Sequence, residues 1–199
     1  MDYLILIDAL HPVPWEVYTS LELKEVSGIL LEVQAAEHLG AMLEKARDEG
    51  IEIKALSGFR SISYQQGLWE RAVARAEAGG MTQPEAVALV SETLAKPRHS
   101  EHNCGLAADL CTPAADDTEE NFCTTSQGKW LAGNAAEYGF ILRYPRMKEH
   151  LTGIAYEPWH YRYVGSEAAE LIKSSGLCLE EFLHFYSDDF YTARWTDTR

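Results

Sequence analysis

The sequence is poor in basic residues: 17 lysines and arginines stand against 31 aspartates and glutamates, a formal net charge of −14 over 199 residues. Proteins that bind nucleic acids need a basic surface that displaces counterions from phosphates. This composition does not supply one, so nucleic acid and an anionic membrane surface are both unexpected partners. A small peptide that meets a local cationic spot remains compatible with the acidic whole.

Long apolar runs are also absent, and no stretch approaches the ~20 apolar residues of a membrane-spanning helix. The apolar run near the N-terminus is only four residues, Leu4 to Ile7, and no basic residue precedes it. A secretory signal needs both a basic start and a longer apolar core. If Met1 is the native start, the sequence therefore predicts a cytoplasmic protein with no membrane insertion.

Cysteine is scarce, and no two cysteines form a C-x-x-C pair. The even count of four leaves disulfides open, but their density is low for a disulfide-stapled secreted domain. Free thiols are the favoured reading, and Cys104 is expected to be a buried, inert one. No serine lies in a Gly-x-Ser-x-Gly setting, so serine hydrolase chemistry has no support.

The length predicts a single domain over residues 1–199, with its characteristic motifs between residues 57 and 165. Apolar alternation predicts strands; they cover residues 3–8, 51–56, 106–110, 140–142 and 159–164. Helical periodicity and capping signals predict helices at residues 28–49, from Ser63 to Gly79, at 82–95, 126–138, 166–175 and 179–187. Residues 112–125 read as an irregular acidic loop. The fold class is therefore α+β, with helices beside a small antiparallel sheet.

The first chemical motif pairs His102 with Asp109, seven residues apart, with Gly105 between them. Gly105 permits a sharp turn, so both side chains can aim at one point. Imidazole and carboxylate together suit zinc. The alternative is a surface histidine and an unrelated aspartate at a strand end.

The second motif places Glu157 three residues before His160 in an aromatic segment. A catalytic zinc takes three protein ligands and keeps one open position. His102, Asp109 and His160 supply three ligands, which leaves Glu157 as a general base. Residues 157 and 160 would face opposite sides of a regular strand, so Glu157 must lie at a bend before it, and Pro158 favours such a bend.

The third motif is the segment from Ser57 to Ser61, which contains Arg60, followed by Gln65. An arginine in a glycine turn at a strand end is well placed to grip a carboxylate with its planar guanidinium group. A surface salt bridge is the alternative reading of Arg60.

Together these motifs resemble the VanY/VanX/VanXY family of zinc D-alanyl-D-alanine peptidases, whose fold is shared with hedgehog domains. Residues 140–145 and 152–165 look most like the VanXY type, and the resemblance covers residues 30–186. It implies one Zn²⁺ per chain on His102, Asp109 and His160. It also implies that Glu157 is the catalytic base.

The resemblance further implies that Arg60 binds the substrate or its oxyanion, and that Gln65, Ser100 and Trp159 complete the substrate pocket. The chain departs from the family pattern at Asn103-Cys104 and at residues 96–99. Both departures bear on substrate preference, and neither removes a metal ligand.

The expected activity is that of a D,D-carboxypeptidase that acts on the terminal D-Ala of peptidoglycan precursor peptides, with D,D-dipeptidase activity left open as an addition. Such an enzyme serves vancomycin resistance or cell-wall metabolism. Its expected partner is a small peptide, D-Ala-D-Ala or a muramyl peptide. Two alternatives stay open: an L,D-carboxypeptidase or peptidoglycan endopeptidase on the same fold, and a non-catalytic, zinc-stabilised peptide-binding module.

Overall fold

A four-stranded antiparallel sheet forms the centre of the computed structural model, which describes residues 1–115, 117–118 and 120–186. Its strand order is β3-β4-β6-β5, with bounds Lys54–Ser57, Ala107–Cys111, His160–Tyr163 and Phe140–Leu142. Every residue of β4 and β6 is buried, as the two central positions of the sheet require. The α+β class and the small antiparallel sheet are as the sequence predicts.

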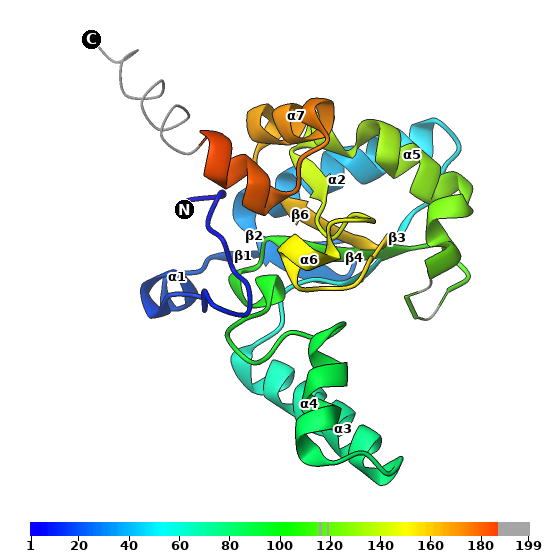
Figure 1. Cartoon of the computed structure of the whole chain (residues 1–199). Coiled ribbons are helices and arrows are strands. Elements are labelled where there is room, and N and C mark those ends of the chain that lie inside the picture. Colours follow the sequence, from blue (N-terminus) through cyan, green and yellow to red (C-terminus); the bar gives the residue numbers. More distant parts are fainter. Residues whose placement is uncertain (116, 119, 187–199) are drawn as a thin grey trace.

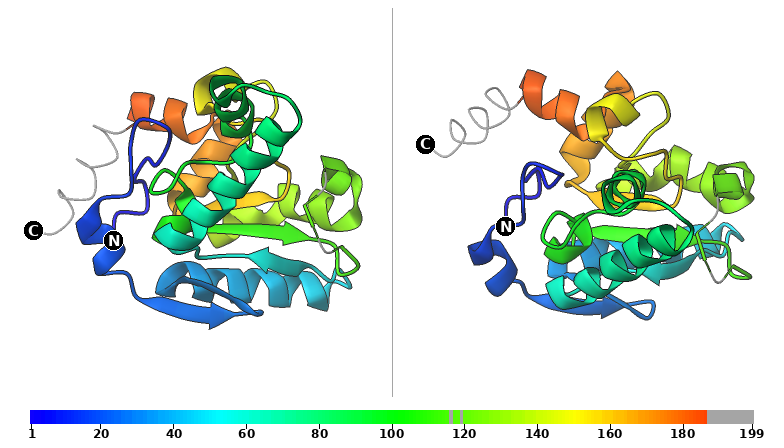
Figure 2. Two further views of the ribbon diagram at one scale, coloured as in Figure 1. Left: turned by 90° about the horizontal axis from the view of Figure 1, so that it is seen from below. Right: turned by 60° about the horizontal axis from the view of Figure 1, so that its bottom comes forward.

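Helix α2 (Val33–Asp48) covers one face of this sheet, and Figure 2 shows it as a separate layer. Leu39 and Met42 of α2 belong to the same buried cluster as Ala108, Leu110 and Tyr161 of the sheet. Because side chains alternate along a strand, the residues between them face the other way. That second face receives Asp109 of β4 and His160 of β6, and it is where the polar site forms.

A two-stranded hairpin precedes α2, with β1 at Leu23–Val26 and β2 at Ile29–Glu32. The prediction of one helix over residues 28–49 is therefore wrong at its start. The helix begins at Val33 because the Glu32 side chain accepts hydrogen bonds from the backbone N–H groups of residues 34 and 35. Gly50, at φ +78°, ends the helix as predicted.

Helices α3 (Ile62–Ala78) and α4 (Gln83–Ser91) form a hairpin that projects from the sheet (Figure 1). The pair has its own small core around Val73, Ala86 and Val90. The cap of α3 is Ser61, which accepts a hydrogen bond from the Tyr64 N–H, and not the predicted box at Ser63. The predicted box at residues 82 and 85 is present, but α4 ends at Ser91 and not near residue 95.

The N-terminal segment is the clearest misprediction, because residues 3–8 form no strand. Their carbonyl groups are used differently: the guanidinium group of Arg162 donates to the backbone oxygens of Tyr3 and Ile5, at 3.1 and 2.8 Å. Leu4 packs beside Leu179 in the second buried cluster. The segment is thus held by one buried cation, with no strand partner.

The remaining elements complete the cover of the sheet; they are α1 (Trp15–Thr19), η1 (Glu101–Cys104), η2 (Glu120–Thr124), α5 (Ser126–Asn134), η3 (Ala135–Tyr138), α6 (Glu149–Thr152) and α7 (Ser166–Ser175). Residues 179–186 are also helical, and residue 187 of the predicted last helix lies outside the described residues. The loop predicted at residues 112–125 contains η2. No helix in the described ranges is both long and apolar enough to cross a membrane.

The four cysteines, which all lie among the described residues, form no disulfide, and three of them are buried. Burial raises the pKa of Cys104 to about 11, so this thiol stays protonated and unreactive near neutral pH. The single-domain assignment of residues 1–199 remains a prediction, since residues 187–199 lie outside the described part of the chain.

Candidate active site

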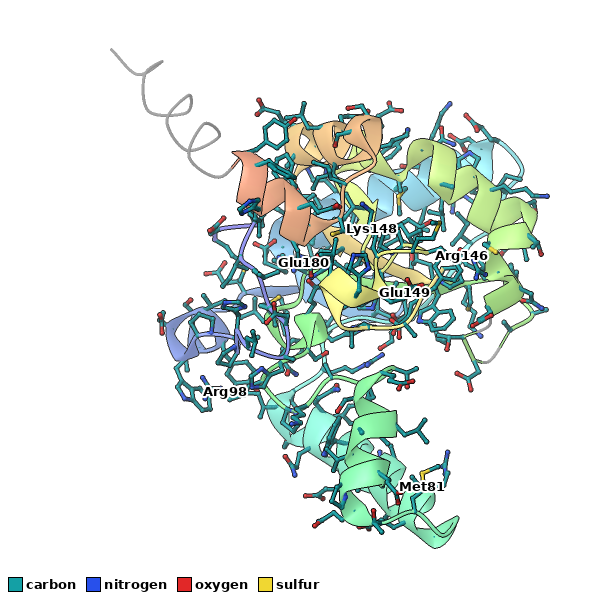
Figure 3. The ribbon with its side chains drawn as sticks, viewed as in Figure 1. Met81, Arg98, Arg146, Lys148, Glu149 and Glu180 are labelled. Atoms are coloured by element: carbon teal, nitrogen blue, oxygen red, sulfur yellow. The ribbon has the colours of Figure 1, made fainter. Side chains whose placement is uncertain are left out.

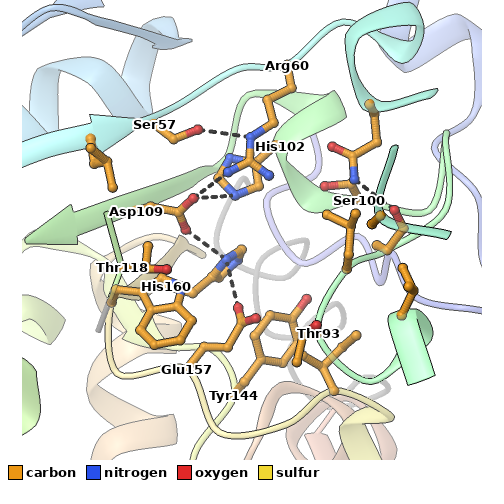
Figure 4. Close-up of a pocket in the computed structure, with 18 of the residues that line it drawn as sticks. Ser57, Arg60, Thr93, Ser100, His102, Asp109, Thr118, Tyr144, Glu157 and His160 are labelled. Atoms are coloured by element: carbon orange, nitrogen blue, oxygen red, sulfur yellow. Dashed lines mark hydrogen bonds and ion pairs between the residues drawn. The ribbon is translucent and has the colours of Figure 1, made fainter. Parts of the chain in front are cut away.

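A cavity of about 590 Å³ opens on the polar face of the sheet, between the strand ends and the α3–α4 hairpin. The sequence-predicted site residues all line it; they are Arg60, Gln65, Ser100, His102, Asp109, Glu157, Trp159 and His160. Figure 4 shows the side chains of His102, Asp109, Glu157 and His160 pointing toward one another across this cavity. Residues drawn from four separate segments of the chain therefore meet at one place.

The strand register brings the central pair together. Asp109 and His160 are direct partners across β4 and β6, so both side chains leave the same face of the sheet. His102 arrives from η1, whose chain reverses at Gly105 with φ +70°. A Cβ at that residue would lie 2.9 Å from the Glu32 backbone nitrogen, so glycine is required on both grounds.

His102, Asp109 and His160 offer ligand atoms that all lie within 4.8 Å of one another, and all three residues are buried. The His102 Nε2 atom lies 3.3 Å from Asp109 Oδ2, and the His160 Nδ1 atom lies 3.2 Å from Asp109 Oδ1. Asp109 Oδ1 receives no hydrogen bond from any residue that the structure describes. A buried acceptor without a donor is costly unless a cation or ligand satisfies it.

The other nitrogen of each imidazole is fixed by a partner outside this cluster. His102 Nδ1 lies 2.7 Å from the Gly58 carbonyl oxygen, which makes Nδ1 the donor and turns the Nε2 lone pair toward Asp109. Gly58 is a close-approach glycine, since a Cβ there would lie 2.3 Å from the Leu30 backbone oxygen. The local backbone therefore sets the direction of the His102 ring.

In this cluster the neighbouring groups outweigh burial in setting the pKa values of Asp109 and His160. Burial would by itself raise the pKa of Asp109, but the His102 and His160 rings hold that pKa well below its usual value. Burial would also lower the pKa of His160, yet the carboxylates of Asp109 and Glu101 raise it to about 9. An ionised carboxylate between two imidazoles is a donor set that suits a divalent cation.

Glu157 lies at a bend immediately before β6, as its spacing from His160 requires. The His160 N–H donates to the Glu157 carbonyl oxygen at 3.2 Å, which closes the turn. The Glu157 side chain comes back over the site, and its Oε2 atom lies 3.6 Å from His160 Nδ1. Burial raises the pKa of Glu157 to about 7, while the nearby His160 opposes this shift.

Arg60 closes the opposite side of the cluster. Its guanidinium group donates to Asp109 Oδ2 at 2.5 Å and to Ser57 Oγ at 2.9 Å. The alternative of a surface salt bridge does not apply, because the Arg60 side chain is only 18% exposed and its partner is buried. Asn103 donates to the Arg60 carbonyl oxygen at 2.6 Å. Asn103 thus holds the backbone at Arg60 from outside the cavity, whose lining does not include it.

The predicted pocket residues differ in their burial and in their hydrogen bonds. Gln65 is fully buried, and its Nε2 donates to the Ala95 carbonyl oxygen at 2.7 Å. That bond leaves Gln65 Oε1 as a buried acceptor with no donor among the described residues. Ser100 is also buried, whereas Trp159 is half-buried at the wall. His99 Nδ1 lies 2.7 Å from the Asp8 carbonyl oxygen, so this ring donates to the N-terminal segment and does not line the cavity.

Glu101 is the important residue that the sequence reading missed. Its Oε1 accepts hydrogen bonds from Arg143 and Arg162 at 2.7 and 2.6 Å, and its Oε2 lies 3.4 Å from His160 Nε2. All three side chains of this carboxylate–guanidinium group are fully buried. Its position next to His102 was the available signal. Tyr144, whose ring lies 4.8 Å from that of His160, was missed as well.

This buried group ties the site to the C-terminal helical segment. Arg143 also forms a bidentate pair with Glu180, at 3.0 and 2.6 Å. Figure 3 shows Glu180 and Lys148 close together beside α6, where Lys148 pairs with Glu181. The orientation of the His160 ring is therefore coupled to the docking of residues 179–186.

Replacing Glu101 with glutamine is expected to destabilise the fold by ~3 kcal/mol, because it leaves two buried guanidinium groups short of one negative charge. The measurement is urea unfolding of the metal-free protein. Glu37→Gln, which breaks an exposed pair with Lys24, is the matched control and should cost less than ~1 kcal/mol. Equal stability of Glu101→Gln and wild type would contradict the expected role.

The stabilisation from Glu101 is also expected to depend on pH. Burial would raise the pKa of Glu101, but Arg162 and Arg143 hold it well below its ordinary value. A carboxyl group with a lowered folded-state pKa stabilises the fold above its unfolded-state pKa. The difference between wild type and Glu101→Gln should therefore shrink as the pH falls toward the folded-state pKa.

Two histidines, one aspartate and a neighbouring glutamate on a small antiparallel sheet form a donor set of the kind that metallopeptidases use to hold a catalytic metal. A model of the family described as VanY, D-alanyl-D-alanine carboxypeptidase, matches residues 28–166. The chain belongs to this VanY family of D-alanyl-D-alanine carboxypeptidases.

Curated relatives agree with this assignment. A D-alanyl-D-alanine carboxypeptidase of Enterococcus faecalis is 37% identical over 91% of this chain and 65% of its own length. The bifunctional D-Ala-D-Ala dipeptidase and carboxypeptidase VanXYC of Enterococcus gallinarum is 33% identical over 68% of this chain and 70% of its own length. The chain thus spans slightly less than two thirds of the E. faecalis relative.

Solved structures show the same fold. VanYB in complex with D-alanine-D-alanine has a TM-score of 0.82 and 36% identity, covering 92% of this chain and 98% of its own. A D,D-pentapeptidase VanY variant in complex with Zn(II) has a TM-score of 0.81 and 36% identity, covering 92% and 99%. The LD-carboxypeptidase LdcB has a TM-score of 0.76 and 33% identity, covering 92% and 86%.

Proposed function

We propose that this chain is a zinc-dependent D,D-carboxypeptidase that removes the terminal D-Ala of peptidoglycan precursor peptides, with D,D-dipeptidase activity as a second capacity. Such a reaction would serve vancomycin resistance or cell-wall metabolism. The observation that carries the proposal is the meeting of three metal-binding side chains and a buried glutamate in one cavity, in a member of the VanY family.

The residues fit one Zn²⁺. The donor set of two imidazoles and one carboxylate is typical of catalytic zinc, and the undonated Asp109 Oδ1 calls for a positive partner. His102 would bind through Nε2 and His160 through Nδ1, because their other nitrogens face Gly58 and Glu101. When bound, zinc supplies Lewis acidity and makes a water molecule more acidic.

Glu157 is proposed as the general base. It takes a proton from the attacking water and passes it to the leaving amine. A pKa raised by burial to about 7 fits both steps, since the group accepts and returns a proton near neutral pH. Its Oε2, 3.6 Å from His160 Nδ1, lies beside the proposed metal position.

Arg60 and the remaining pocket residues are proposed to hold the substrate. The guanidinium group of Arg60 offers donors to a carbonyl oxygen that gains negative charge, or to the terminal carboxylate. Gln65 Oε1 is a buried acceptor that a substrate N–H would satisfy. Ser100 supplies a hydroxyl group, and Trp159 an apolar wall.

A second candidate is an L,D-carboxypeptidase on the same fold, because LdcB shares it at 33% identity; a peptidoglycan endopeptidase is a further variant of this candidate. The stereochemistry at the residue before the cut distinguishes D,D from L,D activity. A non-catalytic zinc module is disfavoured, because binding a peptide requires neither a buried general base such as Glu157 nor the Arg60–Asp109 pair at the cavity.

The activity test compares matched peptides and their products. The zinc-loaded protein should release D-Ala from a muramyl pentapeptide ending in D-Ala-D-Ala. It should leave a tetrapeptide with an L-D terminal bond uncut. Chelation should abolish release, and added zinc should restore it. Cleavage of only the L-D bond would replace the proposal with the second candidate, and no release from either would reject the enzyme.

Replacing His102 with alanine is expected to weaken zinc binding ~100-fold or more, because second-shell changes alone cost 10–100-fold and this change removes a ligand. Metal titration with a competing chelator measures the affinity. His150→Ala, at an exposed position on α6, is the matched control and should bind zinc like wild type. Undiminished affinity in His102→Ala would remove His102 from the proposed ligand set.

The proposed location of the protein is the cytoplasm. The proposed partner is a small peptide, and nucleic acid is disfavoured by the charge of −14. Fractionation of cells that express the native gene product tests the location, and binding of fluorescent oligonucleotides at low salt tests the second point.

A further inference from the structure

A second cavity, of about 250 Å³, has no described lining residue in common with the proposed catalytic one. Its lining comes mainly from α5, η3, β5 and α7, and Figure 1 shows α5 and α7 at the end of the molecule opposite the α3–α4 hairpin. Phe140 belongs to the buried cluster under α2 and Ile141 to the second cluster, because neighbouring strand residues face opposite sides of the sheet. Both residues line the cavity, which is therefore a groove along the outer edge of β5.

Strand β5 is an edge strand, since β6 is its only partner among the described strands. The Arg143 N–H donates to the His160 carbonyl oxygen at 3.2 Å, so the backbone groups of Arg143 face β6. Because this direction alternates along an antiparallel strand, the backbone groups of Phe140 and Leu142 point away from β6. Neither residue's N–H or carbonyl group makes a hydrogen bond with a described residue.

Leu142 is the one of these two residues that an incoming chain can reach. Phe140 is fully buried, whereas Leu142 is partly exposed and lines the groove. An unpaired strand edge is a ready template for a further strand, whose N–H and carbonyl groups would pair with those of Leu142. A helix has no free backbone groups along its length to offer there. The edge at Leu142 therefore favours an extended peptide as the occupant.

Cationic side chains stand at the rim of the groove, and none of its described lining residues is acidic. The Arg146 guanidinium group lies 4.0 Å from the centre of the Tyr156 ring and makes no ion pair with a described residue. Lys173 donates to a backbone carbonyl oxygen of α5 at 2.5 Å, which leaves two of its three N–H groups for a ligand. Lys148 is already paired with Glu181. In a chain with a net charge of −14, this local positive charge favours an acidic occupant.

We propose that this groove binds an extended, acidic segment of a partner protein. The segment adds to the sheet edge at Leu142, lays an apolar side chain against the groove walls and presents carboxylates to Arg146 and Lys173. The cavity is smaller than the ~300–1,000 Å³ of typical small-molecule sites, so it suits one or two apolar side chains of a longer chain. The docking site does not depend on the proposed reaction.

The probe is a fluorescent six-residue peptide of alternating valine and glutamate, titrated into the zinc-loaded full chain. A version with glutamine in place of glutamate should bind more weakly, by ~1.5–5-fold for each exposed ion pair lost. A version with methylated backbone nitrogens should bind ~5–100-fold more weakly, because it cannot pair with Leu142. Arg146→Ala should weaken only the glutamate peptide, by ~1.5–5-fold. Lys129→Ala, at an exposed position on α5 outside the groove, is the matched control and should bind like wild type.

Hydrogen exchange shows where the probe binds. Exchange of the Leu142 N–H should slow ~10-fold with the glutamate peptide at about ten times its Kd, while the Ile141 N–H, which faces β6, stays protected throughout. D-Ala-D-Ala should not displace the probe, because the two cavities share no described lining residue. Binding without a change at Leu142, displacement by D-Ala-D-Ala, or no binding up to ~1 mM would each overturn the docking site.

Discussion

The Glu157→Gln protein is expected to keep its fold and its zinc while kcat for D-Ala release falls ~10²–10⁴-fold, the usual loss when a general base is removed. Glutamine has nearly the same shape as glutamate but accepts no proton at neutral pH. The side chain is already buried, so the change removes a charge whose desolvation is unfavourable. Stability should therefore be equal to or slightly above that of wild type.

The measurement combines turnover with two controls on the protein itself. Zinc content and the melting temperature establish that the site and the fold persist. Glu149→Gln removes the same charge from an exposed position on α6 that does not line the cavity, and it should turn over like wild type. Turnover of Glu157→Gln within threefold of wild type would mean that another group takes the proton.

The sequence-predicted site residues lie together in one cavity, and part of this follows from their coming in short segments. His102 and Asp109 are joined by one glycine turn, and Glu157 and His160 by one bend, so spacing alone limits where each pair can point. The meeting of the two pairs depends on the register of β4 against β6. Register is a long-range property, and only the family resemblance supplied it at the level of sequence.

The errors in the predicted fold have a common physical cause. Residues 3–8 have the composition of a strand, but their carbonyl groups are bound by Arg162, a residue 157 to 159 positions away. Residues 29–32 have helical periodicity, yet they pair with β1, and Glu32 sets the helix start. Local pattern is outweighed in both places by tertiary contacts. The sequence did not predict the role of Glu101 for the same reason, since its two arginine partners lie far along the chain.

Replacing Arg60 with alanine is expected to lower kcat ~10²–10³-fold, the cost of one lost oxyanion donor. Water attack on a peptide carbonyl builds negative charge on its oxygen, and the guanidinium group of Arg60 lies at the edge of the cluster as a cationic donor. Ser57 and Asn103 hold its side chain and backbone in place, so the group is preorganised.

The ratio of kcat to KM effects decides which role Arg60 has. If it stabilises the transition state, kcat falls with little change in KM; if it only anchors the terminal carboxylate, KM rises and kcat is nearly retained. Because Arg60 also contacts the proposed ligand Asp109, zinc affinity must be measured in parallel, and rates compared at saturating zinc. Arg60→Lys keeps the charge but loses the planar guanidinium group, so it should recover only part of the lost rate. Wild-type values of both constants in Arg60→Ala would leave the arginine as a structural partner of Asp109 with no part in the reaction.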